Sequence, residues 1–201
     1  MLVRPPRLLR KYYKDSVWRM NKDEPVIYLT FDDGPIEGLT PWVLDTLKQY
    51  GVKATFFCVG NNVEINHLIY ERILNEGHKA GNHTYDHIKG WKSKTRDYLQ
   101  NVERCEQLTK TKLFRPPYGR IKMPQFTRLI KEYKIVFWDV LTYDYDKLVT
   151  PETCLQNSIK YTRNGSIVVF HDNMKAQKNL KFVLPKYIEH FLKLNYKFSV
   201  L

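Results

Sequence analysis

The chain has 201 residues, of which 43% are hydrophobic and 14% aromatic, a composition that suits one globular domain and excludes a disordered chain. Its 33 Lys and Arg against 21 Asp and Glu give a formal net charge of +12, which predicts attraction to anionic surfaces and polymers. The basic residues are spread along the sequence, so we expect no specific nucleic-acid partner. The widely spaced Cys58, Cys105 and Cys154 indicate free thiols rather than a disulfide framework.

Residues 1–24 form a basic extension, in which Tyr12, Tyr13 and Trp18 are candidate anchors onto a domain that spans residues 25–201. The N-terminus shows neither the apolar segment nor the small-residue cleavage site of a signal peptide. We therefore expect the protein to be cytoplasmic, with peripheral contact to an anionic membrane surface and export as the open alternatives for its location. We also expect it to be a monomer.

From residue 26 onward, short apolar runs alternate with amphipathic stretches. The runs predict strands at Val26–Phe31, Ala54–Val59, Lys79–His83, Leu113–Arg115, Ile135–Val140, Ser166–His171 and Lys197–Leu201. The stretches predict helices at Pro41–Tyr50, Asn66–Glu76, Ser93–Thr109, Pro124–Tyr133, Pro151–Thr162 and Leu180–Leu194. This alternation indicates an α/β fold with parallel strands and crossover helices, as an open sheet or a barrel. Polar residues at the carboxyl ends of several strands favour a barrel.

Two adjacent carboxylates, Asp32 and Asp33, follow the first apolar run directly and precede a Gly-Pro turn. Neighbouring residues of a strand point to opposite sides. The two carboxylates can therefore have different roles, in which one binds a cation and the other accepts or donates a proton.

A histidine pair, His83 and His87, follows the third predicted strand with the four-residue spacing that places both imidazoles on one side of a helical turn. Together with Asp33 the pair forms a set of two imidazoles and one carboxylate. Three such ligands with an open position are typical of a catalytic zinc site. Surface histidines in a polar loop are the alternative interpretation.

Three later segments carry further polar groups. Arg115 ends a strand, where a cation can keep Asp32 ionised, and the prolines after it would leave the backbone N–H of Tyr118 free to face a substrate oxygen. A rigid Pro-Pro loop with an incidental arginine is the alternative interpretation. Residues 138–146 contain both acidic and aromatic residues. This composition is typical of the wall of a cleft, but it is also found on ordinary protein surfaces. His171 ends an apolar strand, where a core histidine is common, but its place at the same barrel end favours an acid–base role.

These segments, in the order 30–35, 83–87, 115–119, 139–145 and 169–171, carry a family resemblance. From about residue 26 to its end the chain resembles the polysaccharide deacetylases of carbohydrate esterase family four, which include chitin and peptidoglycan deacetylases. Two positions depart from the family pattern. Asp144 is followed by Tyr145 where the family commonly has Trp, and Val169-Phe170-His171 stands where it often has Leu-x-His.

The resemblance implies an irregular (β/α) barrel with a divalent metal, usually zinc, for which cobalt or manganese can substitute. The implied ligands of that metal are Asp33, His83 and His87. Asp32 is the implied general base, and Arg115 is the cation that orients it. The Tyr118 N–H is the implied donor to the oxyanion. His171 is the implied general acid, steered by Asp144, and Tyr145 belongs to an aromatic wall.

The implied reaction is hydrolysis of the N-acetyl amide of an amino-sugar glycan, with acetate as one product. A cytoplasmic location would instead favour a small or lipid-linked amide as substrate. A non-catalytic glycan-binding relative that uses the charge of +12 is the third hypothesis. The presence of Asp32, Arg115 and His171 argues against it, because binding alone needs no acid–base pair.

Overall fold

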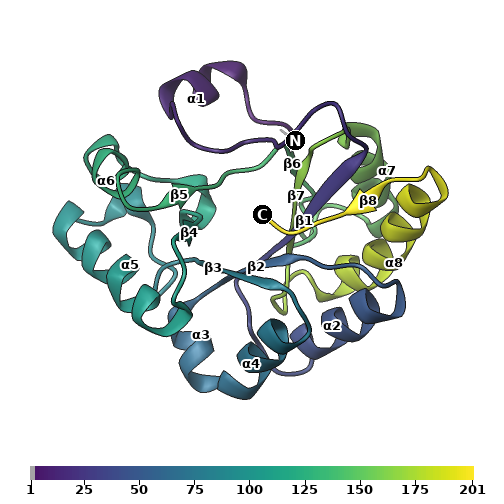
Figure 1. The fold of residues 1–201 in the computed structure, drawn as a ribbon, viewed down its shortest axis with the longest axis horizontal. Helices are drawn as coiled ribbons and strands as arrows, with labels where there is room; N and C mark the ends of the chain where they lie inside the picture. The colour runs from purple at the N-terminus through teal and green to yellow at the C-terminus, as the bar shows by residue number, and fades with distance from the viewer. Residues whose placement is uncertain (1–2) are drawn as a thin grey trace.

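The structure, a computed structural model, describes residues 3–201 and consists of alternating strands and helices around one curled sheet (Figure 1). Its strands are β1 (Val26–Asp32), β2 (Thr55–Cys58), β3 (Lys79–Asn82), β4 (Leu113–Phe114), β5 (Lys134–Ile135), β6 (Val140–Leu141), β7 (Ile167–His171) and β8 (Lys197–Phe198). Its α-helices are α1 (Arg7–Tyr12), α2 (Thr40–Gln49), α3 (Gly60–Ile65), α4 (His67–Asn75), α5 (Thr95–Thr109), α6 (Met123–Leu129), α7 (Pro151–Tyr161) and α8 (Gln177–Lys193). Two short 3₁₀ turns lie at Gly90–Lys92 and Pro117–Gly119.

All strand pairs of the sheet are parallel, and the strands follow the order β5-β4-β3-β2-β1-β7-β6, with β8 pairing to the start of β1. The two ends of this order, β5 and β6, are joined by residues 136–139 alone. The five residue steps from Ile135 to Val140 span at most about 18 Å, so the sheet must curl until its edges approach each other. The expected irregular barrel of about seven parallel strands is confirmed.

The expected strand Ile135–Val140 is wrong as one element, because the chain changes neighbours within it. The backbone N–H of Val136 donates to the carbonyl of Phe114 in β4, whereas that of Asp139 donates to the carbonyl of Ile167 in β7. The segment therefore crosses from one edge of the sheet to the other. Asp139 directly precedes β6 and so lies away from the carboxyl ends of the strands.

Alternate side chains of β1 point to opposite faces of the sheet, one toward the outer helices and the other toward the barrel interior. Ile27, Leu29 and Phe31 are fully buried in the hydrophobic core between the sheet and its outer helices. Thr30 and Asp32, which have the opposite orientation, contact Arg115 inside the barrel. This alternation, a property of any strand, is what turns Asp32 toward the interior.

The helical layer has the expected apolar spacing. Val43, Leu44 and Leu47 of α2 are fully buried. At the start of α7 the hydroxyl of Thr150 accepts a hydrogen bond from the Thr153 backbone N–H, and Pro151 occupies the first turn, an arrangement that favours the start of a helix. The cysteines are free and buried, as expected.

The N-terminal segment contacts the barrel through Tyr13 and Trp18, whose rings both stack on Phe137. Tyr13 and Trp18 are buried, but Tyr12 is 55% exposed, so this third expected anchor is not buried with them. Asp139, fully buried, accepts hydrogen bonds from Arg10, Arg163 and Ser166. In residues 3–201 no helix has the length and apolar character required to cross a membrane.

Candidate active site

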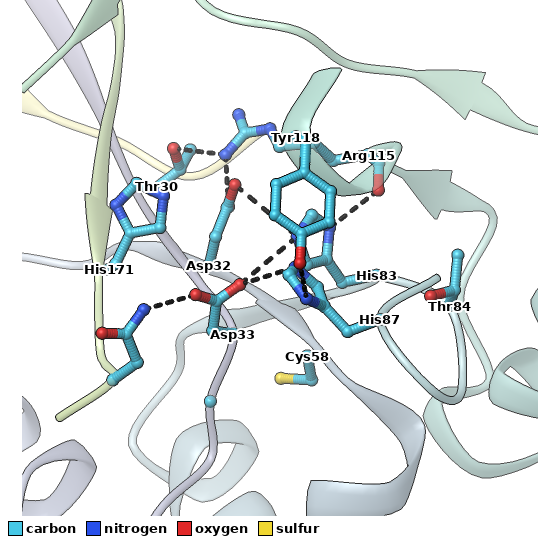
Figure 2. A network of polar contacts seen from close by, with 12 residues as sticks. Thr30, Asp32, Asp33, Cys58, His83, Thr84, His87, Arg115, Tyr118 and His171 are labelled. Carbon is cyan, nitrogen blue, oxygen red and sulfur yellow. Dashed lines mark hydrogen bonds and ion pairs between the residues drawn. The ribbon is translucent and has the colours of Figure 1, made fainter. Parts of the chain in front are cut away.

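The carboxyl ends of β1, β3, β4 and β7 bring the predicted site residues together at one end of the barrel (Figure 2). Asp32 ends β1 and His171 ends β7, and these two residues are direct neighbours in the parallel register of the two strands. His83 and Arg115 follow β3 and β4 directly. The barrel thus places side chains that are far apart in sequence on one surface.

Asp33, His83 and His87 form a cluster whose potential ligand atoms all lie within 4.8 Å of one another. Asp33 Oδ1 is 3.0 Å from His87 Nε2 and 3.6 Å from His83 Nε2. The other Asp33 oxygen, Oδ2, accepts a hydrogen bond from the side-chain amide of Asn173. Both imidazoles therefore present the same nitrogen to the carboxylate (Figure 2).

The opposite ring nitrogens of the two histidines have partners of their own. His83 Nδ1 lies 2.7 Å from the backbone carbonyl of Arg115, which can only accept, so the neutral ring carries its proton there and leaves Nε2 unprotonated. His87 Nδ1 lies 3.2 Å from the Tyr118 hydroxyl. Burial lowers the pKa of His83 to about 4, despite the opposing effect of Asp32 and Asp33. A neutral imidazole with an oriented lone pair fits a divalent cation, and so does this donor set.

Asp32 is held from behind by Arg115, a fully buried residue. Arg115 Nη1 donates to Asp32 Oδ1 at 2.6 Å and to Thr30 Oγ1 at 2.8 Å. The other two nitrogens of the same guanidinium group, Nε and Nη2, donate to the carbonyls of Val136 and Phe137 in the segment that joins β5 to β6. Asp32 Oδ2 accepts no hydrogen bond from any group in residues 3–201 and lies 3.9 Å from His83 Nε2, toward the cluster.

His171 is held in a similar way by Asp144, which is also fully buried. Asp144 Oδ1 lies 2.8 Å from His171 Nδ1, and its Oδ2 accepts a hydrogen bond from the His171 backbone N–H at 2.7 Å. Burial of the imidazole lowers its pKa, but Asp144 outweighs that effect and raises the pKa of His171 to about 9. At neutral pH His171 is therefore an imidazolium that can donate a proton from Nε2.

An open cleft of about 690 Å³ lies over these groups. Asp32, Asp33 and both histidines of the cluster line it, and so do Tyr118, Tyr145 and His171. Arg115 and Asp144 lie behind the lining side chains that they contact. The ring of Tyr145 stands edge-on to His171, with the ring centres 4.6 Å apart.

The backbone N–H of Tyr118 makes no hydrogen bond to another residue in the described chain. Tyr118 has a left-handed backbone conformation, with φ of 61°. Its neighbours Gly119 and Arg120 donate instead to the carbonyls of Pro116 and Pro117. The Tyr118 N–H is thus available to an acceptor in the cleft, as the Pro-Pro loop suggested.

Sequence reasoning missed Asn173 and Asp172, although both follow His171 at a strand end that had already been singled out. Asp172 is fully buried and accepts hydrogen bonds from the Gly34 N–H at 3.0 Å and the Thr40 hydroxyl at 2.6 Å. A Cβ on Gly34 would lie 2.0 Å from Asp172 Oδ2, so the turn after Asp33 requires glycine. Asp172 thereby fixes the loop that carries Asp33.

Comparisons with known proteins find similar sequences and a similar fold. The family model for polysaccharide deacetylase matches residues 19–136. A peptidoglycan-N-acetylglucosamine deacetylase of Bacillus cereus is 34% identical over 203 residues, covering 95% of this chain and 94% of that protein. The peptidoglycan-N-acetylmuramic acid deacetylase PdaA of Bacillus subtilis is 33% identical over 186 residues, covering 84% and 69%. A crystal structure of a peptidoglycan N-acetylglucosamine deacetylase in complex with an N-oxidanyl-benzamide superposes with a TM-score of 0.87 at 33% identity, covering 96% and 94%.

Proposed function

The chain belongs to the polysaccharide deacetylase family, and on that premise we propose that it removes N-acetyl groups from an amino-sugar glycan by metal-dependent hydrolysis. One observation carries the proposal. A carboxylate held by an arginine and an imidazolium held by a carboxylate face the same cleft as a three-residue cation cluster. The curated relatives that act on peptidoglycan amino sugars support this substrate class.

We propose that Asp33, His83 and His87 hold one zinc ion, for which cobalt or manganese can substitute. A divalent cation held there supplies positive charge that polarises a carbonyl group and makes a nearby water more acidic. Two neutral imidazoles and one carboxylate are ligands that zinc accepts in catalytic sites. The hydrogen bond from His83 Nδ1 to the Arg115 carbonyl fixes the ring in the orientation that such a ligand requires.

The chain's own residues supply the proton transfers. Asp32, oriented by its hydrogen bond from Arg115, takes a proton from the water that attacks the acetyl carbon. The Tyr118 N–H donates to the carbonyl oxygen as negative charge develops on it. His171 donates its proton to the nitrogen of the leaving amine, since an unprotonated amide nitrogen is a very poor leaving group. The products are acetate and a free amino sugar.

Acetate release from a substrate panel tests the proposed reaction. We expect zinc-loaded protein to release acetate from N-acetylglucosamine oligomers, to lose that activity on chelation and to regain it with zinc. Elemental analysis should then find about one zinc per chain. If acetate is released from small amides or sugar lipids but not from the glycan oligomers, those compounds and not the glycan are the substrates. No acetate from any compound of the panel would favour the non-catalytic glycan-binding alternative.

We propose that the enzyme acts as a monomer, because this chain alone supplies a three-residue cation cluster and both proton-transfer pairs. No second subunit is needed to complete the cluster or either proton-transfer pair. Sedimentation equilibrium at micromolar concentration should therefore give the mass of one chain, 24.1 kDa.

A pH profile of Asp144→Asn tests the role of His171. Because Asp144 raises the pKa of His171 from its ordinary value to about 9, the acid is protonated below that pH and is lost above it. Asparagine cannot provide the negative charge, so the pKa of His171 should fall. We expect kcat to drop and its alkaline limb to move to lower pH. An unchanged alkaline limb would assign that limb to another group.

A further inference from the structure

The short helix α1 buries none of its side chains, although the residues around it are fixed to the barrel. Leu8 is 78% exposed, Tyr12 55% and Leu9 36%. In Figure 1 the helix lies at the periphery of the molecule, outside the ring of strands. Two largely exposed side chains one helical turn apart, Leu8 and Tyr12, therefore form an outward ridge. The Tyr12 ring touches only the neighbouring Tyr13 ring among the aromatic contacts of residues 3–201, edge-on with the ring centres 4.9 Å apart.

Contacts on the inner side of α1 set the direction of that ridge. Arg10 Nη2 lies 2.8 Å from the buried Asp139, and the Tyr13 hydroxyl donates to the Ile121 carbonyl at 2.6 Å. Leu8 and Tyr12 stand two residues before and after Arg10. At 3.6 residues per turn, two residues correspond to roughly 200°, so these side chains point away from the barrel. The ridge is thus presented by a helix whose orientation is fixed.

Cations flank the ridge. Arg7, Lys11 and Lys14 are exposed, and none of them forms an ion pair with an acid in residues 3–201. An exposed apolar ridge with unpaired cations beside it is the composition of helices that lie in the interface of an anionic membrane. The aromatic and aliphatic groups enter the headgroup region while the cations meet lipid phosphates.

We propose that residues 7–14 dock the protein on an anionic lipid bilayer surface, with Leu8 and Tyr12 inserted among the headgroups. An anionic wall polymer fits less well, because it would engage the cations and leave the apolar ridge in water. The proposal does not depend on the deacetylase chemistry, since it concerns vesicle binding and uses none of the cleft residues.

Co-sedimentation of the full chain with lipid vesicles tests the proposal. We expect binding to vesicles of phosphatidylglycerol and phosphatidylcholine, weak binding to phosphatidylcholine alone, and a decrease at high salt. The double variant Leu8→Ser/Tyr12→Ser should lower the partition coefficient at least tenfold. The variant Arg7→Gln/Lys11→Gln should lower it by about tenfold or more. Acetate release from a soluble substrate should stay unchanged in both variants.

Matched variants elsewhere on the surface separate this site from the general positive charge. Leu68 and Leu148 are 69% and 92% exposed, and Lys48 and Lys178 are exposed as well. Leu68→Ser/Leu148→Ser and Lys48→Gln/Lys178→Gln should bind vesicles like the unmodified protein. Equal vesicle binding by the α1 variants and these controls would overturn the proposal. So would α1 variants that lose binding to isolated anionic wall polymer while keeping vesicle binding.

Discussion

Replacing Asp32 by Asn is expected to abolish nearly all acetate release while the protein keeps its metal. The side-chain oxygen of Asn can still accept the hydrogen bond that Arg115 Nη1 donates at 2.6 Å, so the local packing is preserved. What disappears is the basic oxygen facing the cluster. General base catalysis typically contributes about 10²–10⁴-fold, and we expect kcat to fall by about three orders of magnitude. Steady-state acetate release and elemental analysis measure the two quantities.

Asp86→Asn is the matched control for that substitution. Asp86 is exposed, lies in the loop between His83 and His87, and accepts a hydrogen bond from Asn101 without lining the cleft. The same chemical change there should leave kcat within a factor of about two. Wild-type kcat in Asp32→Asn would show that the base is another group. Loss of zinc in that variant would instead make Asp32 part of the cation site.

The strand ends made most of the candidate site predictable from sequence. In a parallel barrel every carboxyl end of a strand lies on the same face, so placing Asp32, His83, Arg115 and His171 at strand ends was enough to bring them together. That inference tolerates errors of one or two residues in strand length. β4, for example, has two residues, and Arg115 still follows it directly.

Asp139 shows where this reasoning fails. It belongs to the acidic and aromatic segment for which a cleft wall and an ordinary surface were both open, yet it is buried and precedes β6 instead of following it. Arg10 and Arg163 bind its carboxylate, and their hydrogen bonds outweigh burial and lower its pKa to about 2. Both arginines are far from Asp139 in sequence. A continuous apolar run does not reveal where the chain leaves one strand neighbour for another, so the ends of the short strands there were not predictable.

The hydrogen bonds that orient Arg115 could not be predicted from the sequence for a different reason. Thr30 lies inside the first apolar run, and its hydrogen bond to Arg115 depends on which way that strand faces. Arg115 also donates to the carbonyls of Val136 and Phe137, groups that every residue carries. Sequence patterns identify unusual side chains but not the backbone atoms that orient them.

Replacing His83 by Ala is the second substitution expected to have a very large effect, because it removes one of the three proposed ligands together with its orienting hydrogen bond. Loss of an orienting partner alone typically lowers metal affinity 10–100-fold, so loss of the ligand should exceed about 100-fold. Acetate release should fall to background at micromolar zinc. Zinc titration against a competing chelator, with acetate release measured in parallel, checks both expectations.

His78→Ala separates this effect from simple destabilisation. His78 is likewise buried, its pKa is also lowered to about 4 by burial, and its ring accepts a hydrogen bond from the Ala54 backbone N–H. It lies outside the cluster and the cleft. Both variants lose a buried imidazole and should melt at lower temperature, but only His83→Ala should lose zinc. Full zinc occupancy in His83→Ala would remove this imidazole from the proposed ligand set.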